Sequence, residues 1–257
     1  MSQSDFYQID HAGTTLDLPR VTSILRIIDK SGPLMGWAVK IEREAIKAAL
    51  EAVLTEPGEV DPQHVWDSME KHLKGKRASL KKQDEAANIG RAAHALIEWH
   101  TRRMLGTEAG PEPKVSDESL RAVLAWLDWS QMVGFTPLAT ELRVYCPTCG
   151  FAGTLDTLAK VQGVVTLIDY KTAKAVYPEA LLQVNFYRHA AKMCGVEAEQ
   201  AMVLRLPKTA TDPLPEPVVA PVVPLRCLQA ILTTWRLMRW MNQEPYGTPP
   251  ANGMCAA

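Results

Sequence analysis

Residues 153–171 read GTLDTLAKVQGVVTLIDYK, and this stretch decides the fold. Two apolar segments, 153–159 and 164–171, have the composition of strands, and Gln162-Gly163 between them suits a tight turn. The stretch therefore predicts a β-hairpin. Asp156 lies at the end of the first apolar run, and Asp169 and Lys171 lie at the end of the second. Because Asp169 and Lys171 are two residues apart, we expect them on the same face of the strand.

Neighbouring antiparallel strands can bring Asp156 and Asp169 together. An aspartate or a lysine at the end of an apolar strand is costly to bury unless it is paired or binds a metal. Two carboxylates that face one point form a hard oxygen site suited to Mg²⁺ or Mn²⁺. Lys171 beside them can orient a water molecule or stabilise developing negative charge. The alternative is an ordinary Asp–Lys ion pair at a strand end.

The elements on either side of this hairpin predict an α/β (α+β) layout with one mixed sheet. The Pro- and Val-rich segment 207–224 can supply an edge strand but not a central one. The periodicities predict further strands at 141–145 and 201–206, and helices at about 34–54, 84–104, 116–134, 178–194 and 225–241.

The composition is that of an ordinary globular protein. The 257 residues are 47% hydrophobic and 22% charged, with a formal net charge of −1. A globally cationic nucleic-acid coat is excluded, although a local basic patch is not. No apolar run approaches the length of a membrane span, and the N-terminus lacks a secretory pattern. Without such a span, we expect no membrane partner. Five cysteines at irregular spacing argue against a disulfide framework, so we expect a cytoplasmic, reducing location.

Residues 71–82, KHLKGKRASLKK, form a local basic segment with six Lys/Arg and no acid. A solvated helix face is the simpler interpretation. The alternative is a strip that contacts nucleic-acid phosphates. Its candidate residues are Lys74, Lys76, Arg77 and Lys81.

Two helices can present polar residues to the strand ends. His94 lies four residues after Gly90, so the two share a face of the helix at 84–104. Gln183 and Tyr187 are likewise four apart on the helix at 178–194 and can look back at the carboxylates.

Five segments in order resemble the RecB-like branch of the PD-(D/E)XK nuclease superfamily, which includes phage nucleases and mitochondrial genome-maintenance exonucleases. The segments are IGRAAHALIE (89–98), ELRVY (141–145), GTLD (153–156), IDYKTAK (168–174) and LLQVNFYRHA (181–190). The resemblance covers about 84–206, and LPRVTSIL…LMGWAVK upstream is similar to the helical front end of phage and mitochondrial members.

The resemblance implies a restriction-endonuclease-like core with a mixed central sheet flanked by helices. We expect three regions. Residues 1–83 would be a helical N-terminal region packed on the core, where it could form an arch over a DNA strand. Residues 84–244 would be the nuclease core, and 245–257 a flexible tail.

The resemblance also implies roles for individual residues. Asp156, Asp169, the backbone carbonyl of Tyr170 and His94 would bind Mg²⁺ or Mn²⁺. Lys171 would position or activate the attacking water, with Gln183 and Tyr187 in support. For Glu141, a structural hydrogen bond and an indirect metal contact both stay open. Further candidates for phosphate contacts are Arg91, Lys174 and Arg188.

The function that follows is a metal-dependent DNA exonuclease acting on single-stranded DNA or duplex ends, in recombination, repair or phage replication. Partner proteins from those processes and a phage or prophage origin fit the resemblance, whereas the oligomeric state is open. The alternatives are a structure-specific endonuclease with the same core and a non-catalytic DNA-binding subunit. An unrelated small-molecule enzyme is disfavoured, because the sequence contains neither a Gly-rich phosphate loop nor a nucleophile elbow.

The cysteines give a weaker signal. Cys146 and Cys149 form a CxxC in the expected turn before the hairpin, which supplies half of a metal site. Some relatives hold an iron–sulfur cluster on four cysteines, one of them before the nuclease core. No cysteine precedes Cys146 here, so we do not expect such a cluster. A zinc knuckle shared between two chains has no support, and the simplest expectation is a turn with two thiols.

Overall fold

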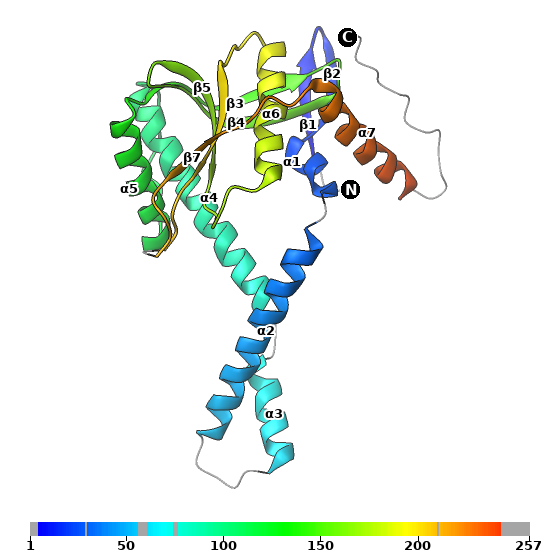
Figure 1. The fold of residues 1–257 in the computed structure, drawn as a ribbon, viewed down its shortest axis with the longest axis vertical. Coiled ribbons are helices and arrows are strands. Elements are labelled where there is room, and N and C mark those ends of the chain that lie inside the picture. Colours follow the sequence, from blue (N-terminus) through cyan, green and yellow to red (C-terminus); the bar gives the residue numbers. More distant parts are fainter. Residues whose placement is uncertain (1–4, 29, 56–60, 74–76, 210, 243–257) are drawn as a thin grey trace. The chain divides into compact units, whose positions relative to one another are not determined.

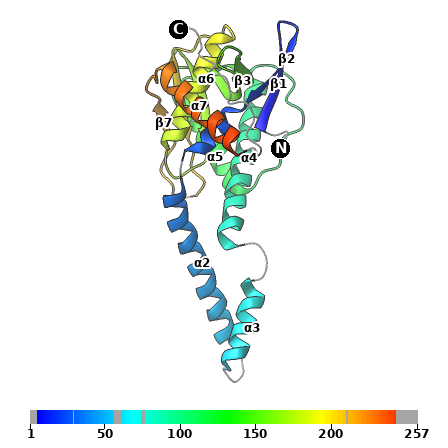
Figure 2. The ribbon, with the colours of Figure 1, turned by 90° about the vertical axis from the view of Figure 1, so that its right-hand side faces the viewer.

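The computed structural model describes residues 5–28, 30–55, 61–73, 77–209 and 211–242. The chain divides into a core unit, residues 1–28 with 89–257, and a helical unit, residues 29–88. Figures 1 and 2 show the elements. They are β1 (Phe6–His11), β2 (Thr14–Pro19), α1 (Val21–Ile24), η2 (Leu25–Ile27), α2 (Ser31–Leu54), α3 (Pro62–Leu73), α4 (Ala78–Met104), α5 (Asp117–Met132), β3 (Thr136–Cys146), β4 (Phe151–Val161), β5 (Val164–Lys171), α6 (Pro178–Met193), β6 (Gln200–Arg205), β7 (Glu216–Val219) and α7 (Leu225–Met241).

The core unit contains a five-stranded mixed sheet in the order β3-β4-β5-β6-β7. β3, β4 and β5 form an antiparallel meander, β6 pairs parallel to β5, and β7 pairs antiparallel to β6. The predicted hairpin is confirmed: Gln162 and Gly163 both have positive φ, as a two-residue turn between twisted strands requires. β7 is an edge strand, as the proline-rich composition of segment 207–224 predicts.

Helices cover both faces of this sheet. On one face α6, α7 and α1 pack on side chains that include Val144, Leu155 and Leu167. On the other face α4 and α5 pack on Ile168 and Tyr170. The prediction of a mixed α/β fold with a helix-flanked sheet is thus confirmed.

The N-terminal region differs from the expected helical region 1–83. β1 and β2 form an antiparallel hairpin, and residues 1–28 group with the core unit. Its turn is Ala12-Gly13, both with positive φ. Ala-Gly is a weaker hairpin signal than Asn-Gly or Asp-Gly, which explains why the sequence pattern did not reveal it.

The helical unit contains α2, α3 and the first residues of α4. The carboxylate of Glu42 on α2 accepts hydrogen bonds from the backbone N–H and the hydroxyl of Ser79, at 2.9 and 2.7 Å. Ser79 lies in the first turn of α4, where backbone N–H groups have no partner within the helix, so Glu42 caps it. α4 therefore begins at Ala78, six residues before the predicted start. The predicted tail, 245–257, lies outside the described residues.

None of the helices in the described part of the chain is both long enough and apolar enough to cross a lipid bilayer.

Candidate active site

The β4–β5 pairing places Asp156 and Asp169 opposite each other on neighbouring strands. The last pair of the ladder is Thr157 with Ile168, so the two aspartates are the next residues along each strand. The backbone N–H of Tyr170 donates a hydrogen bond of 2.7 Å to Asp156 Oδ2. The Asp156 carboxylate therefore accepts the hydrogen bond that a backbone carbonyl of the neighbouring strand would accept in a regular sheet. This hydrogen bond fixes the orientation of the Asp156 side chain.

The sheet is irregular at this point. Leu155 packs in the cluster with α6, whereas Thr157 Oγ1 accepts a hydrogen bond from Tyr170 on the opposite face. In a regular strand residues two apart share a face, so the alternation of β4 changes at Asp156. Opposite Asp156, Glu141 of β3 has φ of +48°, which is uncommon for a residue with a side chain. Strained backbone of this kind is concentrated at functional sites.

Asp169 is held from two sides. Its Oδ2 lies 2.6 Å from Lys171 Nζ, and its Oδ1 accepts a 3.0 Å hydrogen bond from Gln183 Nε2 of α6. The same amide donates to the Tyr187 hydroxyl at 2.8 Å. Gly153 makes room for this ring, because a Cβ there would lie 2.3 Å from Tyr187 Cε1.

His94 reaches the site from α4. Its Nδ1 lies 3.4 Å from Asp156 Oδ2, and its ring meets that of Tyr170 edge-on. One turn earlier, Gly90 allows the close approach of α4 to the loop after β5, since a Cβ there would lie 3.0 Å from Thr172 Oγ1. The structure thus brings His94, Asp156 and Tyr170 together from one helix and two strands.

The charges of these groups are strongly coupled. Burial raises the pKa of Asp169 to about 6, although the Lys171 ammonium acts to lower it. Burial alone would also raise the pKa of Asp156, but His94 and Lys171 lower it overall. Burial opposes the charged forms of His94 and Lys171, yet the two carboxylates raise both pKa values. The protonation of each of these four groups therefore depends on the other three.

The residues fit a divalent cation by their chemistry. The donors are two carboxylates and an imidazole, with the Tyr170 backbone between them. Asp169 Oδ2 is buried and has no hydrogen bond of ordinary geometry, its near neighbour being the Lys171 ammonium. A buried carboxylate oxygen in this condition is suited to an ion, and oxygen-rich donor sets of this kind suit Mg²⁺ and Mn²⁺.

Glu141 lies at the rim of the site. Partial burial, together with the negative charges of Asp156 and Glu98, raises its pKa to about 7, although the residue as a whole stays exposed. Near this carboxyl, Glu98 is paired with Arg102 at 2.7 Å. A carboxyl group that titrates near neutrality beside two others suggests a role linked to proton or metal binding.

The predicted phosphate-contacting residues divide into two groups. Lys174, in the loop after β5, and Arg91, on α4, are exposed in the elements that carry the site. Arg188 instead donates to the carbonyl of Glu199 at 2.8 Å, and the Glu199 N–H donates to Val165 near the start of β5. The structure therefore places Arg188 toward the opposite end of the sheet from the aspartates.

Residues of the basic segment 71–82 belong to the helical unit. Lys74 and Lys76 lie outside the described residues. Arg77 and Lys81 are exposed, while Lys82 Nζ lies 3.8 Å from a carboxylate oxygen of Glu44.

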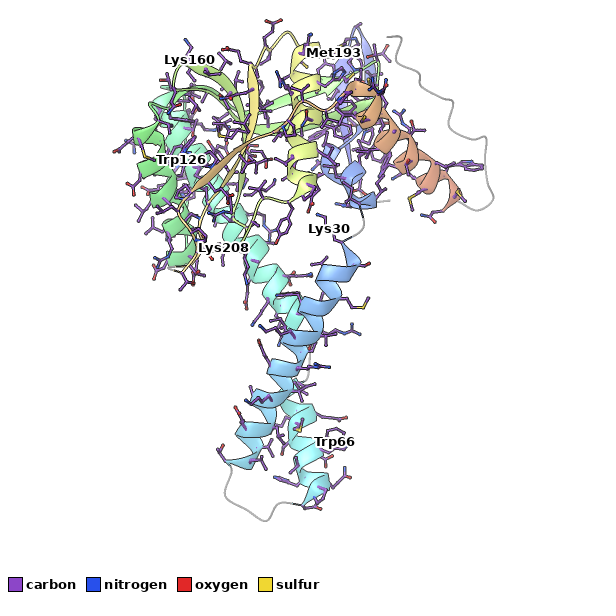
Figure 3. The ribbon with its side chains drawn as sticks, viewed as in Figure 1. Lys30, Trp66, Trp126, Lys160, Met193 and Lys208 are labelled. Atoms are coloured by element: carbon purple, nitrogen blue, oxygen red, sulfur yellow. The ribbon has the colours of Figure 1, made fainter. Side chains whose placement is uncertain are left out.

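Lys208 is a further cation that the sequence pattern did not reveal. It follows β6, in which Arg205 lies opposite Lys171 of β5 in the parallel strand register. Lys208 and Lys160 lie at opposite ends of the sheet (Figure 3). Partial burial and the positive charge of Lys174 lower the pKa of Lys208. The negative charge of Asp212 acts to raise it, but the net effect is a lower pKa. No local sequence pattern could have found it, because its place depends on the parallel pairing of β5 with β6, which carries both strand ends to one end of the sheet.

Comparisons with known proteins do not assign the chain. No family model matches it, and no curated protein matches it. A solved structure titled "Crystal structure of SSO0001" is similar over 80% of this chain and 88% of that chain, with 10% sequence identity and a TM-score of 0.30. A likeness of this degree carries no argument, so the interpretation of the site depends on its own geometry.

Proposed function

We propose that the protein is a metal-dependent deoxyribonuclease of the PD-(D/E)XK type, with a RecB-like core, that acts as an exonuclease on single-stranded or end-bearing DNA. The observation that carries this proposal is that Asp156, in the middle of β4, lies beside the end of β5, which carries Asp169 and Lys171. An antiparallel meander followed by a helix and a parallel strand is consistent with a restriction-endonuclease-like core.

The residues have separate tasks in this proposal. A bound Mg²⁺ or Mn²⁺ would lower the pKa of a water molecule and neutralise charge on the scissile phosphate. Asp156 and Asp169 would hold the ion, with His94 and the Tyr170 carbonyl as further ligands. Because its neighbours raise its pKa, Lys171 stays protonated. It therefore acts by orienting the attacking water and stabilising negative charge, and not as a general base.

Gln183 and Tyr187 are positioning residues. The Gln183 amide fixes one oxygen of Asp169 and is itself fixed by the Tyr187 hydroxyl. This arrangement leaves the second oxygen of Asp169 directed toward Lys171. Lys174, Arg91 and Lys208 are the cations that we expect to contact flanking phosphates.

The setting that we propose is recombination, repair or phage replication, with DNA as the partner. An endonuclease with the same site and a non-catalytic DNA-binding subunit are the competing functions.

A comparison of two substrates tests the proposal. End-labelled linear single-stranded DNA and covalently closed circular DNA are incubated with the protein and Mn²⁺, and with EDTA as the control. We expect metal-dependent loss of the linear strand and an intact circle. Cutting of the circle would indicate the endonuclease. Binding without cleavage of either substrate would overturn the catalytic proposal.

A further inference from the structure

A second cluster of metal-binding side chains lies away from the carboxylates, at the turn between β3 and β4. Cys146 Sγ lies 3.7 Å and Cys149 Sγ 3.9 Å from His189 Nε2 of α6. The three ligand atoms all lie within 4.8 Å of one another. Within the described part of the chain, no other group of three or more His, Cys, Asp or Glu side chains meets that criterion.

The turn is preorganised around the first sulfur. The backbone N–H of Cys149 donates to Cys146 Sγ at 3.3 Å, and that of Gly150 donates to the Cys146 carbonyl at 2.8 Å. Gly150 has φ of +75°, which a residue with a side chain rarely adopts. Hydrogen bonds to a ligating sulfur are the kind of surrounding contact that orients a metal ligand and stabilises its thiolate.

Arg236 of α7 fixes the turn from outside. Its Nη2 donates to the carbonyls of Cys149 and Gly150, at 2.8 and 3.1 Å. A Cβ at Gly150 would lie 2.5 Å from the same nitrogen, so the contact requires glycine. The carbonyls of Cys146, Cys149 and Gly150 are thus hydrogen-bonded, while both sulfurs lie near His189 Nε2.

The distances match a tetrahedral zinc site. With Zn–S of about 2.3 Å and Zn–N of about 2.0 Å, tetrahedral geometry separates sulfur and nitrogen by about 3.6 Å. The two measured separations, 3.7 and 3.9 Å, are close to this value. Thiolate and imidazole ligands suit zinc, whereas Mg²⁺ and Mn²⁺ prefer oxygen, so the two sites would take different metals.

We propose that Cys146, Cys149 and His189 bind a structural zinc ion that ties the β3–β4 turn to α6. Cys149 is disulfide-bonded in this structure, and a disulfide sulfur cannot supply a thiolate. The zinc site therefore belongs to the reduced protein, with the fourth position taken by water.

The site has a consequence for α6. The helix carries His189 and, toward its N-terminus, the Gln183 and Tyr187 side chains that hold Asp169. A zinc ion at the β3–β4 turn fixes this helix against the sheet at a second point. We expect it to stabilise the fold whether or not the protein is a nuclease.

The test measures metal binding in the full chain with a phosphine reductant present. Zinc content is measured by mass spectrometry, and Co²⁺ titration is followed by its thiolate charge-transfer absorption. We expect about one zinc per chain and the cobalt band. Cys146→Ser and His189→Gln should each weaken binding at least about tenfold. Cys227→Ser, at an exposed free thiol of α7, should leave it unchanged.

Three results would overturn the proposal: reduced wild-type protein that is folded but binds neither metal, equal binding by Cys146→Ser and Cys227→Ser, or a cobalt spectrum without thiolate bands. If Cys146→Ser fails to fold, the His189→Gln variant and the spectrum of the wild-type protein still decide the question. Removal of zinc with a chelator should lower the melting temperature of wild type and of Cys227→Ser alike. An unchanged melting temperature would contradict the structural role.

Discussion

Asp169 of β5 connects the lysine of the site with α6. Its side chain is only 2% exposed and is shared between Lys171 and Gln183. Burial dominates its protonation, which is why its pKa rises to about 6 despite a neighbouring ammonium. The residue therefore couples the stability of the metal-free site to pH.

This coupling predicts that the metal-free protein loses stability as the pH rises from about 5 to about 8. The pKa of Asp169 is 3.8 when unfolded and about 6 when folded, so the folded state binds more protons in this window. The stability that protonation contributes is lost as the pH passes the folded value. The raised pKa values of Glu141 and His94 act in the same direction, whereas burial lowers the pKa values of His100 and His189, which act against it.

Urea unfolding in EDTA at both pH values measures this effect. Between these two pH values we expect a contribution of Asp169 of about 1–2 kcal/mol, because part of the shift from 3.8 to about 6 lies below pH 5. Asp169→Asn, which does not titrate, should reduce the difference between the two pH values. A wild-type protein that is more stable at the higher pH in EDTA would contradict the prediction.

Sequence reasoning anticipated the residues of the site to different extents. Asp156, Asp169 and Lys171 follow from strand periodicity and one tight turn, which are local features. The left-handed backbone of Glu141 and the place of Lys208 depend on pairing with neighbouring strands, which no local pattern contains.

At the scale of elements, the position of α6 depends on the absence of a side chain at Gly153 of β4. Gly153 leaves the space that the Tyr187 ring fills, and Tyr187 in turn holds Gln183. The helix itself is set by local sequence, because Pro178 begins it at a position where proline is tolerated. For this reason its predicted bounds, 178–194, nearly coincide with the observed ones. The β1–β2 hairpin was missed because it depends on a weak turn signal and on pairing.

The close packing of Gly153 on Tyr187 predicts that Gly153→Ala destabilises the protein by about 1–3 kcal/mol, the usual cost of overpacking a core. Displacement of Tyr187 should also release Gln183 and lower nuclease activity. Thermal unfolding and the cleavage rate are the measurements.

Gly36→Ala provides a control for this substitution. Gly36 lies in α2, and a Cβ there would meet nothing within 4 Å. Because alanine is the better helix former, this variant should gain up to about 1 kcal/mol. A Gly153→Ala protein as stable and as active as wild type would show that Tyr187 does not depend on this space.

At the scale of the whole molecule, the chain combines a core unit that carries the site with a helical unit that carries exposed basic residues. Arg77 and Lys81 belong to the helical unit and are exposed. Other lysines of this unit are in ion pairs on α2, such as Lys47 with Glu51 at 3.7 Å. All of these cations are exposed, but the carboxylates beside Lys40 and Lys47 partly neutralise their charges, whereas no ion pair among the described residues involves Arg77 or Lys81.

This difference predicts that Arg77→Ala with Lys81→Ala weakens binding to single-stranded DNA and lowers its salt dependence. The slope of log K against log salt should fall by about 0.7 for each phosphate that the variant no longer neutralises. The control is Lys40→Ala with Lys47→Ala, which removes the same charge from paired positions. Fluorescence anisotropy over a salt series measures both, and equal effects in the two double variants would refute a special role for Arg77 and Lys81.

The most direct test of the proposed site is the single-turnover rate of DNA hydrolysis in Mn²⁺ by wild type, Lys171→Ala and Lys160→Ala. Lys160 is an exposed lysine on β4 at the opposite end of the sheet from Lys208. We expect Lys171→Ala to slow hydrolysis at least about hundredfold, because it removes a charge that faces the reacting phosphate. Lys160→Ala should match wild type. Hydrolysis by Lys171→Ala at the wild-type rate, or its absence from folded, metal-supplied wild-type protein, would contradict the proposed nuclease site.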